Sequence, residues 1–130
     1  MKPVTKEPRI LIVEEEAIIA LELKLKLESL GFRYIEAATN TKQAMKKADE
    51  FQPDLVLSEI FFSGKTEDGI TLVKTLKKQF SVEVIFITSL TYLADDPNVQ
   101  HLKPLAVIGK PYREEDLISV LQAKYSLPNH

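Results

Sequence analysis

Charged and hydroxyl side chains stand directly behind short apolar runs in this sequence. The residues that share this placement are Glu14, Glu15, Glu59, Thr88 and Lys110. Three carboxylates around one ammonium would leave excess negative charge, and like charges a few ångströms apart disfavour joint ionisation. A proton or a cation has to relieve that excess. Oxygen-only ligands suit Mg²⁺ or Mn²⁺, whereas Lys110 could instead pair with Glu59 directly.

The apolar runs in front of these residues have the length and composition of strands buried on both faces. Strands are predicted at residues 9–13, 33–37, 55–57, 82–87 and 105–108. Helical spacing and capping residues predict helices between and after these strands. The predicted helices cover residues 17–30, 41–51, 68–80, a short segment capped within 95–97, and residues 114–124.

Five strands that alternate with five helices predict a single doubly wound α/β domain, with a parallel sheet covered on both faces. In this architecture ligands meet the crevice outside the carboxyl ends of the strands. The residues behind the strands are therefore expected to converge. The domain is expected over residues 9–126, after a polar leader at 1–8 and before a tail at 127–130.

Composition restricts the class of function. The 130 residues are 45% hydrophobic and carry a net charge of -2, which suits one core and gives no basic stripe for direct nucleic-acid binding. The absence of cysteine excludes disulfides, thiolate zinc sites and thiol nucleophiles, and fits a reducing compartment. No apolar run approaches the ~20 residues of a membrane span. We expect a cytoplasmic protein without membrane association.

Five stretches of the chain resemble response-regulator receiver domains of two-component signalling. They are residues 10–16 (ILIVEEE), 53–60 (PDLVLSEI), 68–70 (DGI), 84–89 (VIFITS) and 109–112 (GKPY). The resemblance runs from about Arg9 to Lys124 and is specific because the stretches occur together. It implies the flavodoxin-like (βα)5 topology with strand order 2-1-3-4-5. It also implies that Lys110-Pro111 matches a turn that often carries a cis bond.

The resemblance assigns a role to each matched position. In receivers an acidic pair holds Mg²⁺, an aspartate ending the third strand accepts phosphate from a kinase histidine, and a Thr and a Lys contact the phosphoryl group. By position, Glu14 and Glu15 resemble the acidic pair and Glu59 stands at the acceptor position. The carbonyl of Phe61 would complete the metal ligands. The predicted phosphate-contact and switch residues are Thr88, Ser89, Val107 and Lys110.

The departures from the family pattern are as informative as the matches. Glu59 replaces the acceptor aspartate, Glu15 replaces the usual aspartate of the acidic pair, and Val107 stands where receivers commonly have an aromatic residue. An extra methylene at Glu59 should spoil the geometry of in-line attack on phosphorus. The longer carboxylate could instead reach Lys110 and Thr88 and imitate the phosphorylated state. No cofactor is then required, and Mg²⁺ is expected to bind weakly.

An apolar stripe on residues 17–30 points away from the predicted core face. Its members are Ile18, Leu21 and Leu25, which packing on the sheet does not explain. The resemblance implies that this helix faces a histidine kinase, a phosphotransfer protein or an output protein. The alternative for the stripe is partial cover by neighbouring loops. Self-association through the face near the fourth and fifth strands is the competing possibility, and we expect a monomer or a weak homodimer.

The predicted function is that of a non-enzymatic receiver-like domain that acts in a phosphorelay through protein contacts, without ordinary aspartyl phosphorylation. An ordinary phosphorylatable receiver is the first alternative. A Mg²⁺-dependent carboxylate hydrolase or phosphatase is the second, and it would need a nucleophile and a general acid. Glu59 is a poor nucleophile, and His101 and His130 lie on the least ordered predicted helix and at the terminus.

Overall fold

A five-stranded parallel sheet forms the centre of the molecule. The computed structural model describes residues 7–62 and 68–127. The strands are β1 (Arg9–Val13), β2 (Tyr34–Ala38), β3 (Leu55–Ser58), β4 (Glu83–Thr88) and β5 (Ala106–Gly109). They lie in the order β2-β1-β3-β4-β5, all parallel. The predicted doubly wound topology is confirmed.

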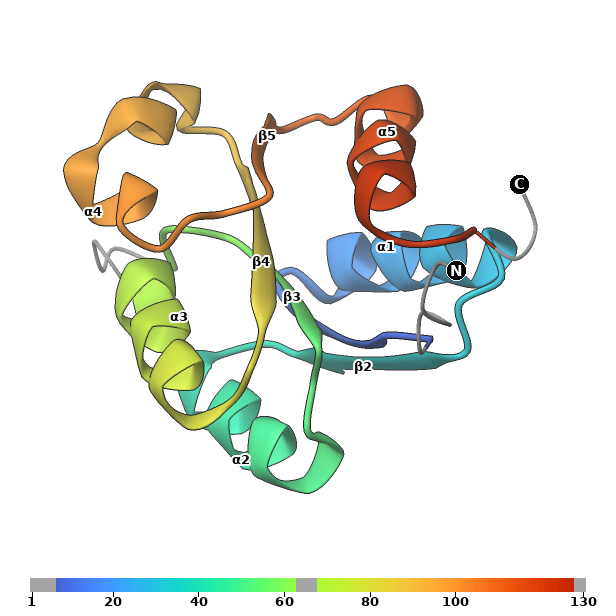
Figure 1. The fold of residues 1–130 in the computed structure, drawn as a ribbon, viewed down its shortest axis with the longest axis horizontal. Coiled ribbons are helices and arrows are strands. Elements are labelled where there is room, and N and C mark those ends of the chain that lie inside the picture. The colour runs from blue at the N-terminus through green and yellow to red at the C-terminus, as the bar shows by residue number, and fades with distance from the viewer. Residues whose placement is uncertain (1–6, 63–67, 128–130) are drawn as a thin grey trace, which may run out of the picture.

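Helices cover both faces of this sheet. They are α1 (Ala17–Ser29), α2 (Thr41–Phe51), α3 (Asp68–Gln79), α4 (Pro97–Gln100) and α5 (Glu114–Lys124), with a 3-10 helix η1 (Thr91–Asp95) before α4. Figure 1 shows α1 and α5 on one face of the sheet and α2 and α3 on the other. In the described part of the chain, no helix combines the length and apolar character needed to cross a membrane.

The element boundaries follow the local signals in the sequence. The side chain of Asn40 accepts the N–H of Gln43 at the start of α2, and that of Asp96 accepts the N–H of Asn98 at the start of α4. Gly31 has a φ of 102° just after α1, a conformation that glycine adopts without steric cost. Most strand boundaries differ from the predictions by one residue, the usual uncertainty of such assignments.

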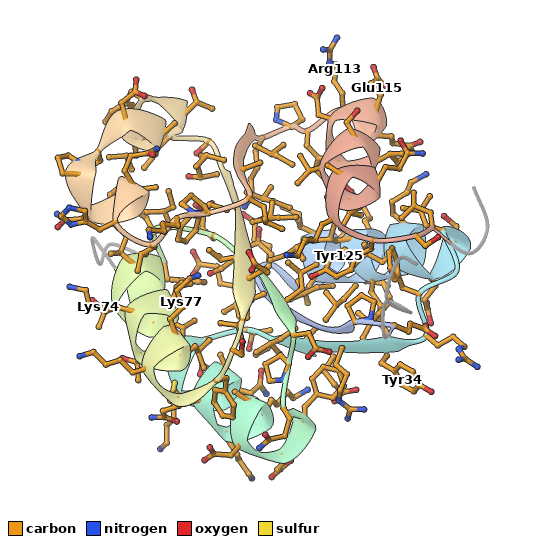
Figure 2. The ribbon with its side chains drawn as sticks, viewed as in Figure 1. Tyr34, Lys74, Lys77, Arg113, Glu115 and Tyr125 are labelled. Carbon is orange, nitrogen blue, oxygen red and sulfur yellow. The ribbon has the colours of Figure 1, made fainter. Side chains whose placement is uncertain are left out.

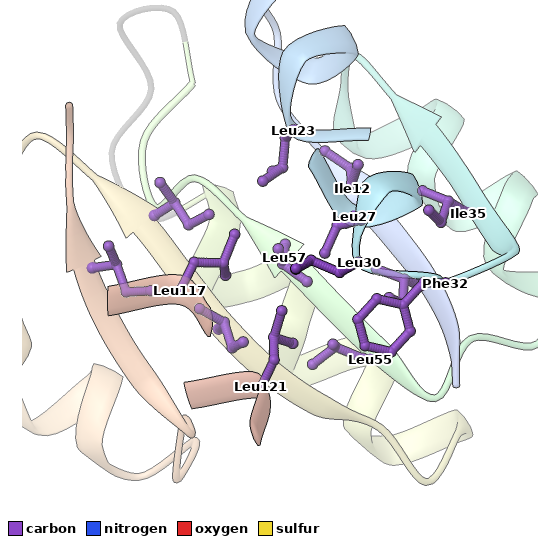
Figure 3. Packing of buried hydrophobic residues seen from close by; sticks show 14 of the residues in the cluster. Ile12, Leu23, Leu27, Leu30, Phe32, Ile35, Leu55, Leu57, Leu117 and Leu121 are labelled. Atoms are coloured by element: carbon purple, nitrogen blue, oxygen red, sulfur yellow. The ribbon is translucent and has the colours of Figure 1, made fainter. Parts of the chain in front are cut away.

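The core on the α1 and α5 side is almost wholly aliphatic. Leu23 and Leu27 of α1 and Leu117 and Leu121 of α5 are buried against the strands, and Figure 3 shows these side chains lying over the sheet. Phe32 and Tyr125 close this layer with an edge-to-face contact, their ring centroids 6.5 Å apart. Burial raises the pKa of Tyr125 to about 12. The helices are therefore fixed by apolar burial rather than by surface charges.

The opposite face is built from two further apolar clusters. One joins Val13 and Val56 to α2 and α3, and the other surrounds Phe86 and Ile60. Phe62 is buried while Phe61 is half-buried, so one of these adjacent aromatics enters the core. The chain directly after β3 is thus anchored by packing, and Glu59 is held between two buried segments.

The start of α3 lies against the backbone that follows β3. The Gly69 N–H donates to the carbonyl of Ile60 at 2.8 Å. A Cβ at Gly69 would lie 2.1 Å from the carbonyl oxygen of Glu59 and 2.8 Å from Cα of Ile60. These neighbours are backbone atoms and cannot rotate away, so only glycine fits here. This contact sets the distance between α3 and the residue behind β3.

Changing Gly69→Ala should therefore destabilise the domain by about 2 kcal/mol or more, because a backbone shift is needed to accommodate the methyl group. The free energy of unfolding in urea measures this. Thr71→Ala, at an exposed position of the same helix, is the matched control and should change stability by less than about 0.5 kcal/mol. Equal stability of the two variants would show that α3 is not constrained at Gly69.

Candidate functional site

Strand register gathers the predicted site residues at one edge of the sheet. Val13 of β1 is level with Ser58 of β3, and Thr88 of β4 is level with Gly109 of β5. Because the strands are parallel, the residues that follow β1, β3 and β5 emerge together. Glu14, Glu59 and Lys110 are those residues.

The Lys110 ammonium lies between two carboxylates, and we call these three residues the charge cluster (Glu14, Glu59 and Lys110). Lys110 Nζ donates to Glu14 Oε1, and it lies 3.0 Å from Glu59 Oε1. The side chains of Glu14, Glu59 and Lys110 are only 6%, 11% and 19% exposed, respectively. Charges buried to this extent need partners. The cluster provides them within itself.

Backbone N–H groups meet the second oxygen of each carboxylate. Glu14 Oε2 accepts the N–H of Glu16 at 3.2 Å, and Glu59 Oε2 accepts the N–H of Ile60 at 2.7 Å and, more distantly, that of Phe61 at 3.4 Å. Two carboxylates and one ammonium leave one formal negative charge, which these N–H dipoles offset. These N–H partners were not predicted, because the sequence alone does not show where the backbone N–H groups point.

The protonated form of Lys110 is stabilised in the folded state. Burial alone would lower the pKa of Lys110, but hydrogen bonds to Glu14 and Glu59, with their charges, outweigh burial and raise the pKa above its ordinary value of 10.5. The Lys110 side chain, held by the two carboxylates, therefore stays positively charged throughout the neutral pH range.

The predicted hydroxyl residues are less closely joined to the cluster. Thr88 is fully buried, and its hydroxyl oxygen accepts the N–H of Leu90 at 3.1 Å. Ser89 is exposed. In residues 7–62 and 68–127, Thr88 makes no hydrogen bond to Glu59. The expected contact of Glu59 with Lys110 is present, whereas the expected contact with Thr88 is not made in this part of the chain.

The predicted metal ligands do not form a metal site as arranged. Glu15 is exposed, while Glu14 and Glu59 both contact Lys110. Among the described residues no three His, Cys, Asp or Glu side chains are grouped so that they could hold a metal ion. The ammonium occupies the place between the carboxylates where a divalent cation would need to bridge them.

The remaining predicted residues, Val107 and the stripe of α1, are not members of the charge cluster. Val107 is half-buried and packs on the apolar cluster around Phe86. Ile18, Leu21 and Leu25 of α1 are 73%, 55% and 55% exposed, which is the predicted outward stripe. The Lys110-Pro111 bond is cis, as the resemblance implies.

Removing the ammonium should destabilise the domain in a pH-dependent way. Lys110→Met leaves two buried carboxylates without their partner and should cost about 2 kcal/mol or more near neutral pH. Because the pKa of Lys110 is raised on folding, its stabilising contribution is complete below 10.5 and is lost as the pH rises through the folded value. The difference in the free energy of unfolding between the variant and the natural protein should thus become smaller in alkali.

Urea unfolding from neutral pH to about pH 11 measures this gap. Lys46→Met, at an exposed lysine of α2, is the control and should change stability by less than about 0.5 kcal/mol at every pH. A gap for Lys110→Met that stays constant or widens in alkali would show that the ammonium does not stabilise the carboxylates.

Comparison with known proteins places this geometry in a family. A family model described as "Response regulator receiver domain" matches residues 10–122. The chain is 34% identical over 113 residues to the phyllosphere-induced regulator PhyR of Methylorubrum extorquens, a match over 86% of this chain and 41% of that protein. It is 32% identical to the phosphate regulon transcriptional regulatory protein PhoB of Pseudomonas aeruginosa, over 88% of this chain and 50% of that protein.

Solved structures give the same result. The signal receiver domain of a modulated diguanylate cyclase from Desulfovibrio desulfuricans G20 has a TM-score of 0.78 and 27% identity, over 91% of this chain and 93% of that one. The chemotaxis response regulator CheY4 of Vibrio cholerae shares the fold with a TM-score of 0.77 at 21% identity, over 91% of this chain and 98% of that one. The chain spans about half the length of the curated relatives that it matches. It belongs to the response regulator receiver domains of two-component signalling.

Proposed function

We propose that this receiver domain transmits a signal through protein contacts, without ordinary aspartyl phosphorylation, and that it has no catalytic activity of its own. The observation that carries this proposal is the contact of Glu59 Oε1 with Lys110 Nζ at 3.0 Å. In receivers the residue at the position of Glu59 accepts the phosphoryl group. Here that position is occupied by a carboxylate already committed to the lysine.

Attack on phosphorus would require Glu59 to leave its present contacts. One of its oxygens contacts the Lys110 ammonium and the other accepts the N–H of Ile60 at 2.7 Å. In-line transfer needs the attacking oxygen about 3 to 3.5 Å from phosphorus, with counter-charge on the transferring group. The extra methylene and the engaged oxygens both oppose this arrangement. Glu59 is therefore a poor acceptor.

The same contact gives Glu59 another role. In the family, the lysine at this position contacts the phosphoryl group that the acceptor carries. Here the Glu59 carboxylate brings negative charge to Lys110 through a longer side chain, without phosphorylation. We propose that the domain is thereby held in one signalling state. The backbone of Ile60 and the packing of Phe62 keep the carboxylate in place.

We propose that no cofactor is required and that Mg²⁺ binds weakly. The chemical reason is competition, because the Lys110 ammonium already contacts both Glu14 and Glu59. A divalent ion would have to displace the ammonium or add to a site with few remaining acidic oxygens.

Phosphorylation can be tested directly. Incubation with acetyl phosphate and Mg²⁺ should give no mass increase of one phosphoryl group, because Glu59 lacks the geometry of an acceptor. The Glu59→Asp variant shortens the side chain by one methylene and should gain partial labelling in the same assay. Intact mass spectrometry measures both, and a calorimetric titration of the same samples should show only weak Mg²⁺ binding.

The outcome separates the alternatives. Stoichiometric labelling of the natural protein would contradict the proposal and establish an ordinary phosphoacceptor. If the Glu59→Asp variant stays unlabelled, the loss of phosphorylation would be assigned to Glu15, which replaces the usual aspartate of the acidic pair. The Glu59→Gln variant is the control and should stay unlabelled, because its amide is no acceptor.

The exposed stripe of α1 is our proposed partner surface. Ile18, Leu21 and Leu25 expose more than half of their area, and a helix of this kind offers apolar anchors at helical spacing. We propose a helical surface of a histidine kinase, a phosphotransfer protein or an output protein as the partner. The domain itself is proposed to be a monomer or a weak homodimer.

A stability measurement decides whether the stripe is needed for folding. The double variant Leu21→Gln with Leu25→Gln should change the free energy of unfolding by less than about 0.5 kcal/mol per site, since both side chains are largely in water. Leu23→Ala, on the buried face of the same helix, should cost about 2 to 5 kcal/mol. A comparable loss in the double variant would mean that the stripe packs against this domain and is not reserved for a partner.

A further inference from the structure

A cavity of about 540 Å³ opens beside the charge cluster, on the face of the sheet that α1 and α5 cover. Its floor is apolar and comes from three strands, with Ile12, Leu57 and Ile87. Leu23 of α1 forms one wall, and Tyr112, after the cis bond to Pro111, forms another. This volume lies within the roughly 300 to 1,000 Å³ of small-molecule sites. The cavity therefore has both the size and the lining of a ligand site.

Four carboxylates line this cavity. Two of them, Glu14 and Glu59, belong to the charge cluster, where Lys110 neutralises only one of their two charges. Glu22 of α1 and Glu114 of α5 also line the cavity, and Glu114 pairs with Lys26 at 2.8 Å. Figure 2 shows that the neighbouring side chains Arg113 and Glu115 project outward from the start of α5. The lining itself thus keeps a negative excess.

The negative charges that line the cavity act on Tyr112. Burial raises the pKa of Tyr112, and the charges of Glu114 and Glu22 raise it further. The ring packs at the edge of the apolar core, so it presents an aromatic surface next to carboxylates. An aromatic face with negative charge around it attracts cations and repels anions.

We propose that this cavity binds a small organic cation, an ammonium or amidinium group on a short aliphatic or aromatic body. The apolar body would fill the space over Ile12, Leu57 and Leu23, where it displaces water from apolar surface. The cationic group would lie near Tyr112 and Glu22. An anion of the same shape would meet the carboxylates and be repelled. The proposal does not depend on whether Glu59 can be phosphorylated.

A ligand in this cavity would contact both helices of one face and the charge cluster. Leu23 belongs to α1, whose opposite side carries the exposed Ile18, Leu21 and Leu25. Occupancy would therefore bear on the same helix that presents the proposed partner surface. A chemical signal could enter the domain here without any phosphoryl transfer.

Three probes of one shape but different charge test the proposal: the 2-phenylethylammonium ion, neutral 2-phenylethanol and the 3-phenylpropionate ion. Each is titrated into the full chain at constant ionic strength and followed by ¹H–¹⁵N NMR. The cation should give saturating shifts at the amides of Leu23, Ile87 and Tyr112. The alcohol should bind more weakly, and the anion most weakly. No saturation with the cation, or equal binding of cation and anion, would overturn the proposal.

A matched pair of charge variants tests the location. Glu22→Gln should raise the Kd of the cation about twofold to fivefold, the effect of one solvent-exposed charge contact. Glu28→Gln removes the same charge from an exposed position of the same helix outside the cavity and should leave the Kd unchanged. Equal effects of the two variants would mean that the cation responds only to net charge, and the cavity site would be rejected.

The cavity can also be filled. Ile19→Trp places a larger side chain at a half-buried position that lines it and should abolish the shifts at Tyr112. The Ile19→Trp variant is first shown to unfold cooperatively in urea, so that a lost signal reports the cavity and not the fold. Undiminished binding in a folded Ile19→Trp variant would overturn the assignment.

Discussion

The pairing of one buried ammonium with two buried carboxylates is the constraint on which the site depends. Glu14 and Lys110 are 96 positions apart in the chain, and Glu59 comes from a third strand. A buried charge without its partner is costly, so all three strand ends must be in register at once. The sheet order β2-β1-β3-β4-β5 satisfies this, since β1, β3, β4 and β5 are consecutive neighbours.

Apolar packing supplies the precision that the charges need. The residue behind β3 is held from one side by the buried Ile60 and Phe62, and the close approach of Gly69 fixes α3 against the same backbone. Electrostatic contacts of exposed side chains would be too weak to impose such an arrangement. The layers of aliphatic side chains fix the strands, and the strands place the carboxylates. Charge pairing then selects the rotamers of the glutamate and lysine side chains.

A single methylene separates Glu59 from the aspartate that receivers have at the acceptor position, and we propose that it changes what this common architecture can do. The receiver fold is retained over residues 10–122, yet the side chain at the acceptor position is long enough to reach Lys110 by itself. Fold and chemistry are separable because the sheet needs only apolar strands, whereas phosphoryl transfer needs an oxygen at a defined place. The proposed role as a phosphorylation-independent module follows from that difference. The adjacent acidic cavity gives the same domain a second way to receive a signal.

Local patterns in the sequence determined most of the fold. Short apolar runs, the Asn40 and Asp96 caps and Gly31 predicted the strands and helices to within a few residues, because these signals act over a single turn. The set of residues at the sheet edge was also predictable, because parallel strands deliver their ends to one edge. The partners of these side chains were only partly predictable, because the sequence left open whether Lys110 pairs with Glu59 or a proton or cation offsets the carboxylates. Thr88 accepts a local hydrogen bond from the backbone of Leu90. Only tertiary structure decides that Glu59 and Glu14 share Lys110 and that α1 and α5 leave a cavity between them and the sheet. Both features depend on distances of a few ångströms between segments far apart in the chain.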